Sequence, residues 1–170
     1  MPGQRAGAPT PYFLSQTHFI LSIGVQYNLE SVPPQFEILE HPADVGFLAY
    51  GATLEELFAN AALAMMSLAC ELQAVEEKES RAIEASAGDK ESLLFAWLAE
   101  ILGVADGEQL VFCRAKVTAI SDQHVTGMVY GEKFDKTRHH AGTYIKAVTL
   151  HQFRIDRSTA GWRAQVYLDV

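Results

Sequence analysis

The chain has 170 residues, of which 49% are hydrophobic and 20% are charged, so it is long enough for one domain with a hydrophobic core and too short for two. Its formal net charge of -8 argues against a protein that grips a nucleic-acid backbone by itself, because such binding depends on lysine and arginine side chains that neutralise phosphates. We therefore expect any RNA to be contacted only indirectly, through another protein.

Residues 1–35 are expected to form a disordered or weakly ordered extension before a single domain at 36–170. Polar residues interrupt the apolar stretch 12–27, which lacks the cleavage site of a secretory signal and is too short and polar to span a bilayer. The two cysteines, Cys70 and Cys113, show no zinc or disulfide spacing. Buried, reduced thiols favour a cytoplasmic protein without membrane contact.

The domain begins with two predicted strands, at 36–39 and 45–50, which are separated by a proline-containing turn. A helix follows from Thr53, because Thr53 and Glu56 form a capping box. Apolar residues then recur at three- and four-residue spacing to Leu72, which predicts one apolar stripe along the helix.

The second half of the domain alternates between helix and strand signals. Weak alternation at 82–87 predicts a strand, and Asp89 is placed to cap a second helix. A polar loop is expected at 131–142. Further strands are predicted at 111–119, 125–129, 143–155 and 162–170. This order predicts an α+β fold, a two-layer sandwich in which two long helices cover one face of a mixed or antiparallel β-sheet.

Few residues of the sequence suggest a catalytic or metal-binding site. The sequence holds no phosphate-binding glycine loop and no hydrolase or metalloprotease motif, and the adjacent pair His139 and His140 is expected to be a solvated part of a loop. Asp44, in the first turn, and Asp169, on the polar face of the last strand, are carboxylates of the kind that bind calcium or magnesium. Their spacing alone does not favour a metal site: it favours Asp44 as a turn-forming residue and Asp169 as a surface residue.

Several blocks of the sequence resemble the archease family. Residues 36–46, FEILEHPADVG, are similar to its opening signature, an aromatic residue followed by an Asp-His-Thr-Ala-Asp turn. Residues 142–151, GTYIKAVTLH, resemble the family's Gly-Thr-Glu-Val-Lys-Ala-Val-Thr-Tyr-His block, and the ending YLDV resembles its Ile-Leu-Asp-Ile. Further similar blocks lie at 49–58, 60–62, 93–98, 131–135 and 138–139. The resemblance covers 36–170, with its blocks in the family's order.

The resemblance implies an archease-like fold and a function. Archeases are cofactor proteins that activate the tRNA-splicing RNA ligase: they promote guanylylation of its active-site histidine and multiple turnover in tRNA splicing and RNA repair. It thus implies a non-catalytic protein with a divalent metal ion, calcium being expected and magnesium or manganese being alternatives. The residues that match the family's metal ligands are Asp44, Asp169 and Val170, and those that match its functional tip are His41 and Lys146.

The sequence departs from the family pattern at three positions near these residues. Pro42 replaces a threonine, Glu40 replaces an aspartate, and Tyr144 replaces an acidic residue near Lys146, so the local partner of Lys146 is open. Two alternative functions remain. One is a chaperone-like or RNA-modulating binding module, which requires an exposed apolar patch or a basic face. The other is a metal-dependent hydrolase built from His41, Asp44, Asp169 and either His139 or His140.

Overall fold

A computed structural model of the chain describes residues 34–40 and 45–170. The predicted extension 1–35 lies almost wholly outside these residues, and the predicted turn at 41–44 lies entirely outside them. The described chain contains two α-helices, a short 3-10 helix and seven strands. All the strand pairs among these residues are antiparallel.

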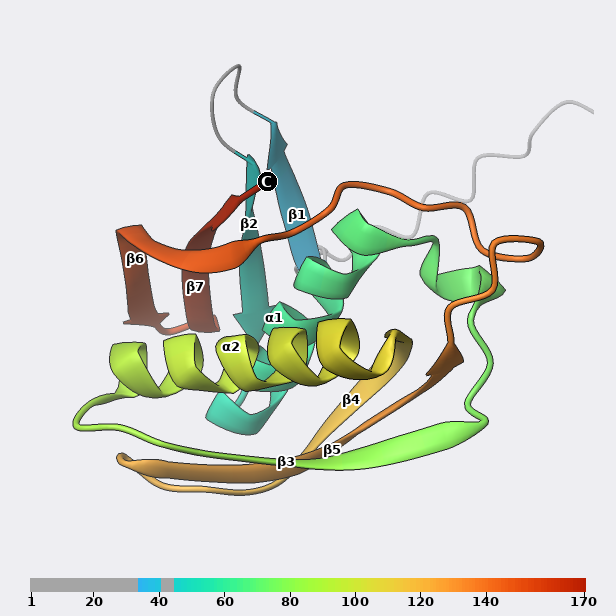
Figure 1. The fold of residues 1–170 in the computed structure, drawn as a ribbon. Coiled ribbons are helices and arrows are strands. Elements are labelled where there is room, and N and C mark those ends of the chain that lie inside the picture. The colour runs from blue at the N-terminus through green and yellow to red at the C-terminus, as the bar shows by residue number, and fades with distance from the viewer. Residues whose placement is uncertain (1–33, 41–44) are drawn as a thin grey trace, which may run out of the picture. The chain divides into compact units, whose positions relative to one another are not determined.

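The first sheet has four strands in the order β1-β2-β7-β6 (Figure 1). The bounds are Phe36–Glu40 for β1, Val45–Gly51 for β2, Ala147–Ser158 for β6 and Gly161–Asp169 for β7. The last strand of the chain therefore lies inside the sheet, between β2 and β6. Its faces follow the predicted alternation, since Ala164, Val166 and Leu168 are buried and the residues between them are partly exposed.

The second sheet has three strands in the order β3-β5-β4. Their bounds are Glu79–Ser86 for β3, Leu110–Ile120 for β4 and His124–Lys133 for β5. A short turn joins β4 to β5, with the Ser121 backbone N–H donating to the carbonyl of His124 at 2.8 Å. β5 is the central strand, so its residues are enclosed by neighbours on both edges.

Both helices begin at the caps that the sequence predicts. In α1, Leu54–Ala69, Thr53 Oγ1 accepts from the Glu56 N–H at 3.2 Å, and Glu56 accepts from the Ala52 N–H at 2.8 Å. In α2, Lys90–Glu108, Asp89 accepts from the Ser92 N–H at 2.8 Å. No helix of the described residues is long and apolar enough to cross a bilayer.

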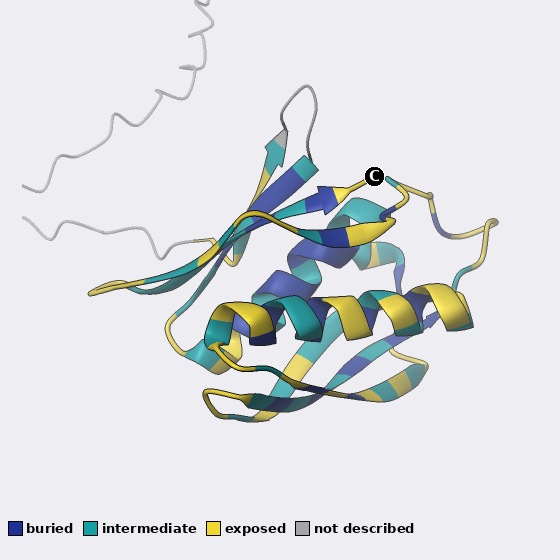
Figure 2. Ribbon diagram, turned by 60° about the vertical axis from the view of Figure 1, so that its left-hand side comes forward, coloured by how far each residue is buried: buried dark blue, intermediate teal, exposed yellow. Residues whose placement is uncertain are grey.

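The helices lie between the two sheets (Figures 1 and 2). α1 packs against β2 on one side and β4 on the other, and α2 packs against β6 and β3. Trp97 of α2 is fully buried, and its Nε1–H donates to the carbonyl oxygen of Phe58 in α1 at 3.1 Å. The core is therefore a layer of helix side chains with a sheet on each side.

The predicted α+β fold with two helices packed on antiparallel strands is confirmed. The strands, however, form two sheets instead of one, and the reason is visible on α1. Its buried residues are Leu57, Phe58, Ala61, Ala62, Ala64, Met65 and Met66, which is more than one stripe, so the helix must be covered from two sides. The helix also ends at Ala69 instead of Leu72, and the strand predicted from residue 143 begins at Ala147.

Candidate functional site

One end of the first sheet brings together Lys146, Asp169 and Val170. Ala147, the first residue of β6, pairs with Asp169, the last residue of β7. The Lys146 backbone N–H donates to the carbonyl oxygen of Asp169 at 2.8 Å, and Lys146 Nζ donates to the main-chain oxygen of Val170 at 2.8 Å. These three predicted site residues are therefore neighbours. We call them the sheet-end site.

The sheet-end site presents oxygen atoms to solvent. Asp169 is exposed, and Val170 is 40% exposed. Carboxylate and main-chain oxygens are the ligands that calcium and magnesium prefer, so the donor chemistry fits such an ion. Lys146 already supplies a positive charge to the Val170 oxygen, and a metal ion there would share that oxygen with the lysine or displace it. Residues 34–40 and 45–170 contain no group of three His, Cys, Asp or Glu side chains that could hold a metal.

The other two predicted site residues, His41 and Asp44, lie outside the described residues. The strands on either side of them are described. Val45, which follows Asp44 in the sequence, pairs with Leu168, which precedes Asp169. The register of β2 and β7 thus runs up to the sheet end that Asp169 occupies, and each of the two paired residues has an aspartate as its next neighbour in sequence.

The segment 134–146 connects β5 to the sheet-end site and caps the C-terminal end of α1. The N–H of Gly142 donates to the carbonyl of Ala69, and the N–H of Thr143 donates to the carbonyl of Leu68, both at 2.8 Å. These carbonyls belong to the last turn of the helix, where no intrahelical partner remains. A Cβ atom on Gly142 would lie 2.2 Å from the oxygen of Leu68, so this close approach requires glycine.

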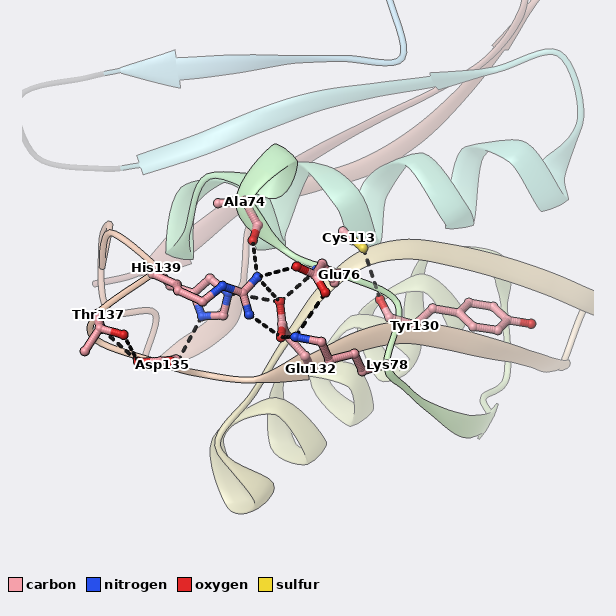
Figure 3. A network of polar contacts seen from close by, with 10 residues as sticks. Ala74, Glu76, Lys78, Cys113, Tyr130, Glu132, Asp135, Thr137 and His139 are labelled. Carbon is pink, nitrogen blue, oxygen red and sulfur yellow. Dashed lines mark hydrogen bonds and ion pairs between the residues drawn. The ribbon is translucent and has the colours of Figure 1, made fainter.

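An ion cluster centred on the buried side chain of Glu132 holds the first half of the same segment (Figure 3). The Glu132 side chain is 6% exposed. It accepts hydrogen bonds from Lys78 Nζ at 2.7 Å, from two nitrogens of Arg138 at 2.8 and 3.0 Å, from the Glu76 N–H at 2.8 Å and from His139 Nε2 at 3.2 Å. We call Glu132, Lys78, Arg138 and His139 the Glu132 cluster. It joins β5 to the chain before β3 and to segment 134–146.

His139 is a structural member of this cluster. Its side chain is fully buried. Nδ1 accepts from the Asp135 N–H at 2.9 Å, so Nδ1 carries no proton and Nε2–H is the donor to Glu132. Both ring nitrogens are therefore occupied, and neither is free to ligate a metal. The prediction of a solvated pair is wrong for His139, because segment 134–146 folds it onto a buried carboxylate, whereas His140 is exposed.

The cluster also determines the charge of Glu132. Hydrogen bonds from Arg138, from Lys78 and from the Glu76 backbone hold the pKa of the Glu132 carboxyl far below its ordinary value. The same contact raises the pKa of Lys78. A carboxyl whose pKa is lowered by folding contributes stability that is complete above its unfolded-state pKa of about 4.3 and is lost as the pH falls below that value.

The two cysteines behave as apolar side chains. Cys70 is buried, and burial, followed by the nearby Cys113 thiol, raises its pKa to about 11. Cys113 is half-buried, and burial likewise raises the pKa of its thiol. The two cysteines pack against Val75 and Val111. Because a raised pKa disfavours the reactive thiolate, neither cysteine adds chemistry to the sheet-end site.

Comparisons with known proteins agree on one family. The model of the Archease protein family (MTH1598/TM1083) matches residues 36–170. The chain is 38% identical over 140 residues to the protein archease of Methanosarcina mazei, covering 80% of this chain and 96% of that one. It is 39% identical over 140 residues to the protein archease of Pyrococcus furiosus, covering 80% of this chain and 99% of that one.

Two solved structures share the fold. Protein 1598 of Methanobacterium thermoautotrophicum, in a solution structure, has a TM-score of 0.68 and 38% sequence identity, covering 80% of this chain and 99% of that one. A crystal structure from Thermotoga maritima, described as an archease and possible chaperone, has a TM-score of 0.55 and covers 78% of this chain and 94% of that one. Its identity of 17% means that it supports the fold alone.

The Glu132 cluster predicts a pH-dependent defect. Glu132→Gln removes the charge that Arg138 and Lys78 share, so we expect Tm at pH 7 to fall by several degrees and amide exchange at Gly142 and Thr143 to accelerate. Because the native stabilisation is lost below about pH 4.3, the difference in Tm between variant and parent should shrink as the pH falls from 5 to 3. Glu77→Gln, which removes an exposed partner of Arg114, is the control, and an equal loss in both variants would contradict a special role for Glu132.

Gly142 and Gly103 make a matched pair. Gly142→Ala should lower the free energy of unfolding by about 1–3 kcal/mol, because the added methyl group forces the chain away from the end of α1. Gly103→Ala lies in α2 with no atom near its new Cβ, and should stabilise the protein by about 0.5–1 kcal/mol through helix propensity. Urea denaturation measures both. A neutral Gly142→Ala would show that the close contact with α1 is dispensable.

Proposed function

The chain belongs to the archease family, and from this premise we propose that it is a protein cofactor of the tRNA-splicing RNA ligase. In this role it promotes guanylylation of the ligase's active-site histidine and multiple turnover in tRNA splicing and RNA repair. The family match over residues 36–170 is the observation that carries the proposal. On this view the ligase supplies the catalytic groups, and the present chain is a non-catalytic activator that acts in the cytoplasm.

The sheet-end site is the proposed point of action. Lys146, Asp169 and Val170 sit at an edge of the domain with Asp169 and Val170 exposed, which suits insertion into the active site of a partner. Their functional groups are a cation, a carboxylate and a main-chain oxygen. Such groups orient phosphates and metal ions in a neighbouring site, and binding and orientation are what an activator without a nucleophile of its own can contribute.

We also propose that Asp44, Asp169 and Val170 hold a divalent ion, calcium before magnesium or manganese. Support comes from the strand register, because Val45 pairs with Leu168 and the two aspartates are their next neighbours in sequence. In an antiparallel strand pair, the next residues beyond a paired position lie opposite each other, a few ångströms apart, if the pairing continues. When bound, such an ion would offer open coordination positions to phosphate oxygens.

Lys146 is the proposed positioning residue for Asp169 and Val170 in this site. It holds both Asp169 and Val170, through its backbone N–H and its Nζ respectively. Tyr144, two residues earlier, is 66% exposed and offers no carboxylate, so the partner of the Lys146 ammonium is supplied by Val170. The Lys146 ammonium is thus hydrogen-bonded to Val170, just beyond the end of β7, instead of to a residue of its own segment.

A chaperone-like binding role is a second candidate, because the described chain has an apolar pocket. The pocket has a volume of about 400 Å³ and lies between the C-terminal ends of the two helices and segment 134–146. Its apolar lining includes Met66, Leu102, Val111, Phe134 and Ile145. A holdase assay with an unrelated unfolded client separates this role from a ligase-specific one, since only a general chaperone suppresses aggregation of that client.

Ligase turnover tests the main proposal. With the partner ligase under limiting GTP, addition of the chain should convert single turnover to multiple turnover. Asp44→Ala and Asp169→Ala should reduce that stimulation by at least about tenfold, roughly 1.4 kcal/mol of lost coupling, without a change in the Tm of the metal-free protein. Asp122→Ala, in the β4–β5 turn, is the matched control and should stimulate fully. Full stimulation by both Asp44→Ala and Asp169→Ala would contradict the sheet-end site as the point of action.

Calcium binding is tested separately by thermal unfolding. An ion that binds only the folded state raises stability by about 2.7 kcal/mol at a hundredfold excess over its Kd, which corresponds to several degrees in Tm. We expect this increase in the parent protein and its loss in Asp169→Ala. An unchanged Tm across calcium, magnesium and manganese titrations of the parent would exclude the proposed ion. The ligase assay would still test activation independently of that result.

A further inference from the structure

Charge is distributed unevenly along this acidic chain. Residues 146–170 carry four basic and two acidic side chains, whereas residues 1–145 carry nine basic and 19 acidic ones. The basic residues of the last segment are Lys146, Arg154, Arg157 and Arg163. The β6–β7 hairpin itself, residues 147–169, carries three arginines and two aspartates, so its net charge is slightly positive in an otherwise acidic chain, which suits phosphate groups.

The hairpin presents one open face. Along β7, Arg163, Gln165, Tyr167 and Asp169 alternate with the buried residues Ala164, Val166 and Leu168, so they point away from the helices. Both helices pack on the buried side of the first sheet, and no other helix or strand among the described residues packs extensively on the open side (Figure 2). We call this side of β6 and β7 the open face.

A β-bulge shapes the open face. The register between β6 and β7 shifts between Thr149 and Arg154, and Gln152 inside the bulge has a φ of 49°, a left-handed conformation that is uncommon for a residue with a side chain. The bulge borders a hollow of about 310 Å³ lined by Gln152, Phe153, Arg154 and Gln165. Bulges of this kind re-aim side chains, and they are frequent beside functional sites.

Aromatic and amide groups lie together around this bulge. The ring of His151, which is exposed, lies 5.8 Å from the ring of Tyr167. Gln165 Nε2 lies 3.3 Å from the backbone oxygen and 3.4 Å from the side-chain oxygen of Gln152. Gln152 Nε2 also lies 3.2 Å from His151 Nε2. Each amide has two N–H donors and an acceptor, so the pair retains hydrogen-bonding capacity for a ligand beyond these contacts.

The nearby cations are only partly neutralised. Arg154 and Arg163 share a single carboxylate, that of Asp156, at 3.3 and 2.7 Å. One positive charge therefore remains available. Aromatic rings, here the exposed His151 and the half-buried Tyr167, together with amides and an arginine, are groups that stack on a base, read its edge and bind its phosphate in single-stranded nucleic-acid sites.

We propose that the open face of the β6–β7 hairpin binds a nucleotide, with the base against His151 and Tyr167, the base edge at Gln152 and Gln165, and the phosphate at Arg154. The chemistry is the same for one unit of a single-stranded RNA and for a free nucleotide. Asp169 projects from β7 two residues beyond Tyr167, about 7 Å along the strand, so a bound strand would run toward the sheet-end site. With a strand bound, the open face would give the chain direct contact with RNA, although the net charge of the whole chain argues against such contact.

Direct binding by the full-length protein tests the proposal without any ligase, so its result is independent of ligase activation. Fluorescence anisotropy of a labelled single-stranded RNA decamer should give a Kd of about 10⁻⁴ M or tighter at low salt. His151→Ala should weaken binding about tenfold, the effect of losing one stacked base. His124→Ala, which removes an exposed histidine from β5 in the other sheet, should leave the Kd unchanged.

Competition with GTP, ATP and inorganic phosphate separates the sources of the nucleotide. Displacement by the nucleotides assigns the open face to a mononucleotide, and displacement by RNA alone assigns it to a strand; either result supports the proposal. Displacement by phosphate as efficient as that by nucleotides overturns it, because no base is then recognised. The proposal also fails if binding is absent up to about 1 mM protein, or if His124→Ala and His151→Ala weaken binding equally.

Discussion

The placement of β7 between β2 and β6 is the constraint on which the rest of this structure depends. β7 is the last strand of the chain, and its pairing with β2 joins the C-terminal residues to the beginning of the domain. Its inward residues Ala164, Val166 and Leu168 are buried against the helices. Burial of these side chains fixes the register, because a shift by one residue would turn them all toward solvent. That register in turn puts Asp169 beside Lys146 and next to the start of β2.

Segment 134–146 places Lys146 beside the C-terminal residues that this register positions. The segment has no regular secondary structure over most of its length, yet it is held at two places along that length. The Glu132 cluster holds its beginning through Arg138 and His139, and the end of α1 holds its middle through Gly142. An irregular segment with its polar groups satisfied in this way can position Lys146 as firmly as a strand would. The Glu132 cluster and the sheet-end site are therefore linked by one continuous run of chain.

The two proposed binding surfaces lie on the same hairpin. The sheet-end site offers oxygen ligands and a lysine, and the open face offers aromatic rings, amides and an arginine. β7 contributes to both, with Asp169 at its end and Tyr167 and Gln165 on the open side. On the proposed function, a chain that reaches into a ligase with this hairpin would meet RNA phosphates and metal ions together. The acidic remainder of the chain disfavours contact with nucleic-acid phosphates away from this hairpin.

Local sequence determined much of the fold. Periodicity and capping placed the two helices, from Thr53 and from Asp89, because short-range hydrogen bonds and apolar spacing act within a few residues. Alternation identified the inward face of β7 for the same reason. The family resemblance singled out Asp169, Val170 and Lys146, which the described structure brings together, and Asp44 and His41, which lie outside it.

Only the tertiary structure decided which strands pair, and hence that the helices lie between two sheets. Alternation reports which face of a strand is buried and carries no information about its neighbour. The same limit hid the Glu132 cluster, since Lys78 and Glu132 are 54 positions apart and a glutamate in a polar stretch has no local sign of burial. The sequence predicted a solvated His139, because its buried partner Glu132 is brought to it only by the fold. The sequence by itself thus determined most helices and strands and the family resemblance. Long-range pairing decided that Glu132 is buried and that β7 is a central strand, and these two features position the sheet-end site.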